Sequence, residues 1–109
     1  MIKTGVDLLL NSRLEENIKD PEFLKKVFQI SELKYKDNLK SIFALKEATM
    51  KAIGKKIGWK SIEISYKDSR PIIILSQDIK PENFKSINGS ISHDGEYTIG
   101  FVVMELEDK

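Results

Sequence analysis

Residues 43–56 read Phe-Ala-Leu-Lys-Glu-Ala-Thr-Met-Lys-Ala-Ile-Gly-Lys-Lys, and the rest of the chain is organised around this stretch. Successive residues of an α-helix turn by about 100°, so apolar side chains spaced three and four apart collect on one face. That face carries Ile42, Phe43, Met50, Ile53 and Ile57, with Leu45 at its edge, whereas Ala48, Lys51 and Lys55 point away. The pattern predicts a long central helix that ends at Gly54 and Gly58.

Lys46 interrupts the apolar face of this helix, between Phe43 one turn before and Met50 one turn after. An ammonium group without a partner in an apolar setting is costly, so it loses its proton or binds an anion. We therefore expect an anionic group beside Lys46. Glu47 and Lys51 are four residues apart on the border of the same face. Taken alone, that spacing indicates a surface ion pair contributing about 0.2–0.5 kcal/mol.

The composition describes one domain over residues 1–109, with 40% hydrophobic and 32% charged residues. A net charge of +1 gives no general attraction to nucleic acid or to acidic membranes. No cysteine is present, which excludes disulfides, zinc-thiolate sites and a thiol nucleophile, and suits a reducing compartment. The apolar run Leu8-Leu9-Leu10 is too short for a signal peptide or a membrane span, so we expect a cytoplasmic protein.

Helical signals fill the first half of the chain. A strand is predicted over Ile2 to Leu10, and Asn11 or Ser12 is expected to cap a short helix. Asp20-Pro21 marks a second helix start, with aspartate as the cap and proline at the first helical position. Its buried stripe is Phe23, Leu24, Val27 and Phe28, and a brief turn follows at Ser31-Glu32-Leu33.

After Trp59 the apolar period changes from 3.6 to 2, which is typical of strands. Strands are predicted at 62–66, 72–75, 86–93 and 97–106, with a turn at 67–70 and a type I′ hairpin turn at Asp94-Gly95. Helices before strands predict an α+β fold in which the long central helix packs on a mainly antiparallel sheet.

Few side chains are candidates for chemistry. Asp7 lies among Val6, Leu8, Leu9 and Leu10, so it is either at an exposed strand end or part of a site. His93 is the only histidine, and its position at a hairpin fits a solvated turn residue, a base or a phosphate donor. Ser90 and Ser92 fit the polar face of a strand. The lysines at the end of the central helix, Lys51, Lys55, Lys56 and Lys60, lack the basic excess and interleaved aromatics of a nucleic-acid site.

Three segments together resemble the signatures of the 4′-phosphopantetheinyl transferases. They are Gly5-Val6-Asp7, then Phe43-Ala44-Leu45-Lys46-Glu47-Ala48 with Lys51-Ala52-Ile53-Gly54, and Ser90-Ile91-Ser92-His93 before the last strand. Their order and spacing fit the single-repeat branch, the holo-acyl carrier protein synthases, and the resemblance covers almost the whole chain. The segments 28–35 and 68–71 are similar to the linking turn and to a hairpin of that branch.

The resemblance implies transfer of phosphopantetheine from coenzyme A to a serine of an acyl carrier protein. It assigns Asp7 and Glu47 to a Mg²⁺ ion, which suits the preference of magnesium for carboxylate and phosphate oxygens. It places Lys46, Lys51, Ser92 and His93 on coenzyme A, with Glu47 and Lys51 as catalytic residues, and Arg13 on the carrier protein. The acceptor of the serine proton stays open between Glu47 and a metal-bound water.

The resemblance also implies a homotrimer with each active site between neighbouring subunits. We expect the packing surface on strands 86–93 and 97–106, which carry more apolar side chains than one helix can bury: Ile87, Ile91, Ile99, Phe101 and Val103.

Two positions depart from the family pattern: Leu10 replaces an acidic residue and Ile42 replaces an arginine. If Ile42 occupies a lost phosphate contact, Ile42→Arg would tighten coenzyme A binding; if Ile42 is core, it would destabilise the fold. The departures leave open a catalytically weakened module that binds coenzyme A or a carrier protein. A third alternative is an interaction domain in which Asp7, Lys46 and Glu47 form only a buried ion-pair network.

Overall fold

The structure is a computed structural model that describes residues 1–108. The strands are β1 (Ile2–Leu10), β2 (Ile62–Lys67), β3 (Arg70–Leu75), β4 (Phe84–Asp94) and β5 (Tyr97–Leu106). The α-helices are α1 (Asn11–Glu15), α2 (Pro21–Val27) and α3 (Leu39–Ile53). Four short 3-10 turns connect them: η1 (Asn17–Lys19), η2 (Ile30–Glu32), η3 (Lys36–Asn38) and η4 (Trp59–Ser61).

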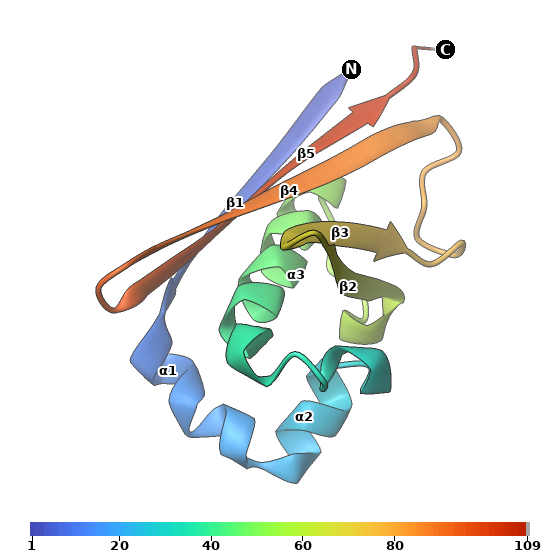
Figure 1. Ribbon diagram of the computed structural model, residues 1–109. Helices are drawn as coiled ribbons and strands as arrows, with labels where there is room; N and C mark the ends of the chain where they lie inside the picture. Colours follow the sequence, from blue (N-terminus) through green and yellow to red (C-terminus); the bar gives the residue numbers. More distant parts are fainter. Residues whose placement is uncertain (109) are drawn as a thin grey trace.

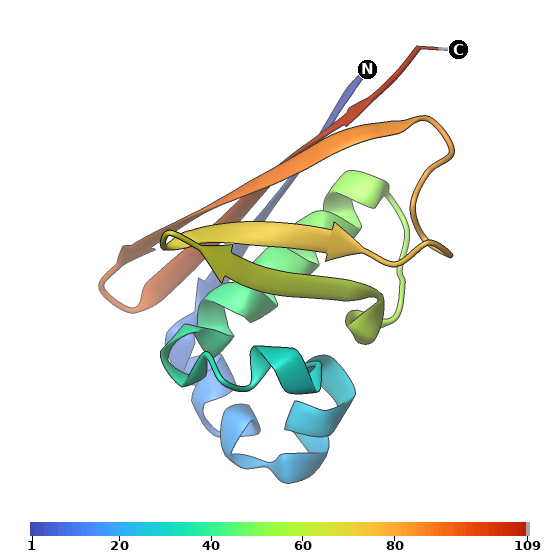
Figure 2. The same ribbon diagram turned by 45° about the vertical axis from the view of Figure 1, so that its right-hand side comes forward.

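The strands form two antiparallel sheets, and α3 lies between them. One sheet has the order β1-β5-β4, and the other is the β2–β3 hairpin. Figures 1 and 2 show the long sheet on one side of α3 and the hairpin on the other, with α1 and α2 at the far end from the chain termini. The predicted α+β architecture of a long helix on antiparallel strands is confirmed, with the strands divided between two sheets.

Glycines let α3 lie directly on the long sheet. A Cβ atom on Gly5 would overlap the carbonyl oxygen of Ala48, and one on Gly100 would lie 2.8 Å from the carbonyl of Ala44. Ala48 is therefore fully buried against β1, and the expectation that it points away from the core is wrong. The reason is that α3 is covered on two sides, so one apolar stripe underestimates its buried surface. The predicted end of the helix at Gly54 is confirmed, with φ of 89°.

The turn predicted at 67–70 is confirmed, because Lys67 pairs with Arg70, but the last hairpin turn differs from the predicted assignment. Asp94 pairs with Tyr97, so the two turn residues are Gly95 and Glu96 rather than Asp94 and Gly95. Only Gly95 has positive φ there, at 56°, which is the pattern of a type II′ turn. The type I′ pattern occurs instead in the β2–β3 hairpin, where Asp68 and Ser69 both have positive φ.

The two N-terminal helices differ in how they begin. Asp20 accepts a hydrogen bond from the backbone N–H of Glu22 at 3.0 Å, with Pro21 at the first helical position, so that prediction is confirmed. No side chain caps α1, and the expectation of a cap at Asn11 or Ser12 is wrong. The Oδ1 atom of Asn11 instead accepts a hydrogen bond from the Thr98 hydroxyl.

Ile42 is a core residue. It is 0% exposed and belongs to the main apolar cluster with Leu45 and Ile64. The hypothesis that Ile42→Arg would add a phosphate contact is therefore wrong, because the guanidinium would be buried in this cluster. The alternative outcome, a destabilised fold, is the one we expect.

The long sheet has one covered face and one uncovered face. Ile87 and Ile91 of β4 pack inward against the core, so the prediction that they belong to an outer packing surface is wrong. The outer face of β1 and β5 exposes large apolar side chains: Ile2, Val6, Leu8, Tyr97, Ile99 and Phe101.

Within residues 1–108, no helix is long and apolar enough to cross a bilayer.

Candidate functional site

Asp7 and Glu47 face one another across the contact between β1 and α3. Asp7 is on the inner face of β1, and Glu47 is in the middle of α3, where both line a cavity of about 270 Å³. Lys51, one turn further along α3, donates a hydrogen bond to the carbonyl oxygen of Val6 at 2.9 Å. Its Nζ lies 3.5 Å from Asp7 Oδ1. The sequence prediction that these three residues belong together agrees with this geometry.

The two carboxylates repel each other. Burial raises the pKa of Glu47, and the charge of Asp7 raises it further, while Lys51 and Lys56 oppose the shift. A divalent cation between the carboxylates would relieve this repulsion. The two carboxylates offer oxygen ligands, which magnesium prefers. Residues 1–108 contain no cluster of three or more His, Cys, Asp or Glu that could hold a metal, so further ligands would come from a substrate or from water.

Basic side chains surround the carboxylate pair. Arg13 of α1 lines the same cavity as Asp7 and Glu47. A second cavity of about 450 Å³ shares Glu47 and Lys51 with the first and adds Lys55 and Lys56 at the end of α3. The combined surface places two carboxylates beside a group of ammonium groups, which is an arrangement suited to a polyanion bridged by a metal ion.

Lys46 does not belong to this surface. Its side chain is 0% exposed, and Nζ lies 2.7 Å from Glu32 Oε1 and 2.8 Å from the carbonyl oxygen of Val27. The expectation of an anion beside Lys46 is confirmed, but its assignment to coenzyme A is wrong because the ammonium group is enclosed. Burial lowers the pKa of Lys46, and the hydrogen bond and charge of Glu32 oppose that effect.

Glu32 is the partner that sequence reasoning missed. Its two carboxylate oxygens also accept hydrogen bonds from the backbone N–H groups of Gln29 and Ile64, each at 2.7 Å. The proposed network of Asp7, Lys46 and Glu47 is therefore wrong in its membership, because Lys46 pairs with Glu32 on another side of α3. The only sequence signal was the turn at Ser31-Glu32-Leu33.

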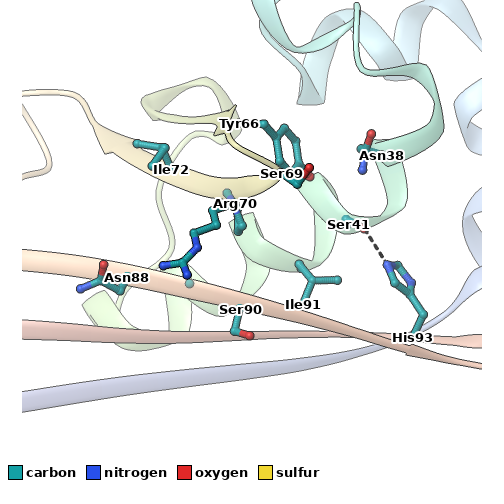
Figure 3. Close-up of a pocket in the computed structure, with 12 residues that line it drawn as sticks. Asn38, Ser41, Tyr66, Ser69, Arg70, Ile72, Asn88, Ser90, Ile91 and His93 are labelled. Atoms are coloured by element: carbon teal, nitrogen blue, oxygen red, sulfur yellow. Dashed lines mark hydrogen bonds between the residues drawn. The ribbon is translucent and has the colours of Figure 1, made fainter.

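His93 lines a separate and larger cavity of about 700 Å³ (Figure 3). The cavity lies between the β2–β3 hairpin and β4, and residues that sequence reasoning did not assign also line it, among them Ser41, Tyr66, Arg70 and Asn88. Ser41 Oγ lies 3.3 Å from His93 Nε2. Within residues 1–108, the hydroxyl of Tyr66 is buried without a hydrogen-bond partner, which would suit a polar ligand in the cavity.

The two sites are separate within one chain. The cavity of Asp7 and the cavity of His93 share no lining residue. α3 contributes Ser41 to the cavity of His93 and Glu47 to the cavity of Asp7. These two residues are six positions apart, so their side chains point in directions that differ by about 120° around the helix axis. Each chain therefore carries two surfaces that open in different directions.

Ser92 and Leu10 line neither of these cavities. Ser92 pairs with Ile99 and is exposed, so the structure does not bring it to the cavity of His93, its neighbour in sequence. Leu10, three residues after Asp7, falls on the other face of β1. Leucine at this position, where the resemblance implies an acidic residue, leaves the carboxylate pair intact.

Comparisons with known proteins agree with these features. Residues 3–102 match the profile of the 4′-phosphopantetheinyl transferase superfamily. The chain is 37% identical to holo-[acyl-carrier-protein] synthase of Finegoldia magna, over 98% of both chains. It is 37% identical to that of Helicobacter pylori over 96% of this chain and 98% of the relative. The crystal structure of a Helicobacter pylori holo-[acyl-carrier-protein] synthase with coenzyme A superposes with a TM-score of 0.84 at 32% identity, covering 96% and 100% of the two chains.

Proposed function

This chain belongs to the 4′-phosphopantetheinyl transferase superfamily, and from that membership we infer that it is a holo-acyl carrier protein synthase. It transfers 4′-phosphopantetheine from coenzyme A to a serine of an apo-acyl carrier protein and releases adenosine 3′,5′-bisphosphate. The observation that carries this conclusion is the pair Asp7 and Glu47 beside Lys51 in one cavity. We further propose that residues 1–109 form one catalytic domain in the cytoplasm, in keeping with the absence of cysteine.

We propose that Asp7 and Glu47 hold Mg²⁺ at the coenzyme A pyrophosphate. When bound, the ion neutralises negative charge on the phosphate groups. Lys51, which lies beside Asp7, would contact the same phosphates, and its ammonium group would stabilise the negative charge of the departing bisphosphate. The serine oxygen of the carrier attacks phosphorus, the bond to the leaving phosphate oxygen breaks, and the serine proton passes to Glu47 or to a water beside it.

Coenzyme A, in this proposal, binds between two chains. Its pyrophosphate contacts Asp7, Glu47 and Lys51 of one chain, and its nucleotide end enters the cavity of His93 in a neighbouring chain. The two cavities share no lining residue within one chain, which supports this arrangement.

A homotrimer would supply the neighbouring chains. Its interface is proposed at the outer face of β1 and β5, where Val6 and Leu8 are 54% and 61% exposed beside Ile99 and Phe101. Exposed apolar surface of this kind is typical of association sites.

Light scattering should give the mass of three 12.5 kDa chains. Phe101→Glu should produce monomers, whereas Ile74→Glu, a similarly exposed position on β3 that lines neither cavity, should not. A wild-type mass of one chain at micromolar concentration would refute the trimer.

Arg13 is proposed to bind the acidic carrier protein, because its exposed guanidinium lies at the rim of the cavity that holds Asp7 and Glu47. Exposed charges act mainly on association and are screened by salt. Arg13→Glu should therefore raise the Michaelis constant for the carrier by roughly tenfold and that for coenzyme A little. Lys67→Glu, on the distant β2–β3 hairpin, is the matched control. Equal effects of Arg13→Glu on both substrates would argue against this surface.

The function is tested by incubating the protein with coenzyme A, Mg²⁺ and an apo-carrier protein, and measuring the intact mass of the carrier. A gain of one phosphopantetheinyl group is expected, and it should disappear when the acceptor serine of the carrier is replaced by alanine. Chelation of divalent cations should stop the reaction. Thermal stabilisation by coenzyme A without modification of the carrier would instead indicate the binding module that lacks efficient transfer.

A further inference from the structure

A chain of hydrogen bonds runs from the cavity of His93 to the junction of β1 and α1. Ser41 Oγ lies 3.3 Å from His93 Nε2, and Nδ1 of the same ring lies 3.1 Å from Thr98 Oγ1. Thr98 donates its hydroxyl hydrogen to Asn11 Oδ1 at 2.7 Å. Figure 3 shows the first contact, with the imidazole directed at Ser41. Thr98 is 1% exposed, so water does not compete for its single hydrogen.

The direction of these bonds determines where the ring proton lies. Because Thr98 gives its only hydrogen to Asn11, its oxygen faces His93 with lone pairs and can only accept. Nδ1 must then carry a hydrogen. In the neutral ring Nε2 is left as the acceptor, and the hydroxyl of Ser41 can donate to it.

We propose that Thr98 and Asn11 are positioning residues that hold His93 with the hydrogen on Nδ1 and direct Nε2 to Ser41 and the cavity. Nδ1 is a donor in the neutral and in the protonated ring, so its bond to Thr98 survives either state. Only Nε2 changes its role, from acceptor to donor, and the hydroxyl of Ser41 can turn to suit both. The ring therefore keeps one orientation toward a ligand whichever protonation state the ligand requires.

This inference rests on the proposed function for its consequence, because the cavity is the proposed site for the nucleotide end of coenzyme A. It predicts that Asn11, at the start of α1, affects the binding of a ligand at β4 through Thr98 and His93. The arrangement depends on neighbours that the sequence separates by 87 residues, Asn11 and Thr98.

The experiment uses the single histidine of the chain. Protein labelled with ¹⁵N-histidine is examined by NMR without ligand, at the alkaline end of a pH series where the ring signals no longer move. Wild type should give a protonated Nδ1 and an unprotonated Nε2. Thr98→Ser and Asn11→Asp keep the hydroxyl and the acceptor, and should give the same result.

Thr98→Val removes the acceptor, and Asn11→Ala frees the threonine hydrogen to turn toward Nδ1. Both variants should move the ring proton to Nε2, and each should weaken coenzyme A binding in calorimetry by roughly three- to tenfold. A protonated Nε2 in the neutral wild type, or identical spectra for all variants, would overturn the proposal. Its failure is separable from that of the function, because the spectra need no substrate: wild type that does not bind coenzyme A would refute the function alone.

Discussion

Glu47→Gln and Asp7→Asn should each lower kcat/KM for carrier modification by on the order of 10²–10³-fold, because each removes one of the two carboxylates assigned to the metal. Both substitutions keep the shape of the side chain, so the cavity beside Lys51 is preserved. Glu82→Gln, on the exposed connection before β4, is the matched control and should leave activity unchanged. Near-full activity of either site variant at saturating Mg²⁺ would show that its carboxylate is not a ligand.

Glu47→Gln should stabilise the metal-free protein although it lowers activity. Burial and the charge of Asp7 raise the pKa of Glu47 above that of the unfolded chain. Between the two pKa values the folded state binds more protons than the unfolded state, so stability is greatest below the unfolded pKa and falls as pH rises through this window. Without metal, Glu47→Gln should remove that fall, and melting temperatures measured across acidic pH would reveal it. An unchanged pH profile would mean that folding does not disfavour the charged form of the Glu47 carboxylate in the metal-free protein.

Lys46→Met should destabilise the fold by about 3–5 kcal/mol, because it leaves the enclosed Glu32 carboxylate without its cation. Lys46 also donates to the carbonyl oxygens of Val27 and Trp59, so it joins the end of α2 to η4 and, through Glu32, to β2. Denaturant unfolding measures the loss. Lys55→Met, an exposed lysine beyond the end of α3, serves as the control and should change stability by less than about 0.5 kcal/mol.

A double variant tests whether the loss of stability in Lys46→Met comes from breaking the ion pair with Glu32. Glu32→Gln keeps an oxygen that can accept from the backbone N–H of Ile64 but removes the charge. Combining Glu32→Gln with Lys46→Met should therefore cost less than the sum of the single substitutions. Additive losses would show that the two groups are not coupled. If Lys46→Met folds but no longer binds coenzyme A, Lys46 contacts the phosphates after all, in spite of its burial.

The sequence was most informative where chemistry and local pattern coincide. Asp7 and Glu47 are carboxylates in apolar surroundings and also match family motifs, and the structure places both in one cavity. The strands of the second half follow from alternation, and the end of α3 follows from Gly54. The α+β class was predictable because each of these signals is local.

Other features depend on which segments meet in space, and local patterns do not contain that information. Lys46 needed an anion, yet its partner Glu32 lies in a short turn that joins α3 only through tertiary packing. Ile42 stands where the resemblance implies an arginine, and its place in the core depends on the β2–β3 hairpin covering α3. The bond between Asn11 and Thr98 depends on the register of β1 on β5, so periodicity could not predict it.

The central proposal is that one working site is built from two chains. It is tested by mixing Glu47→Gln, which lacks the metal carboxylate, with a His93→Ala/Arg70→Glu variant, which lacks the second cavity, after unfolding and refolding them together. In a cyclic trimer of equal random composition, about a quarter of the sites would combine an intact Glu47 with an intact neighbouring His93 cavity. We predict that the mixture regains about a quarter of wild-type transfer activity, although each variant alone is nearly inactive. Activity no higher than the mean of the two variants would contradict a site shared between chains.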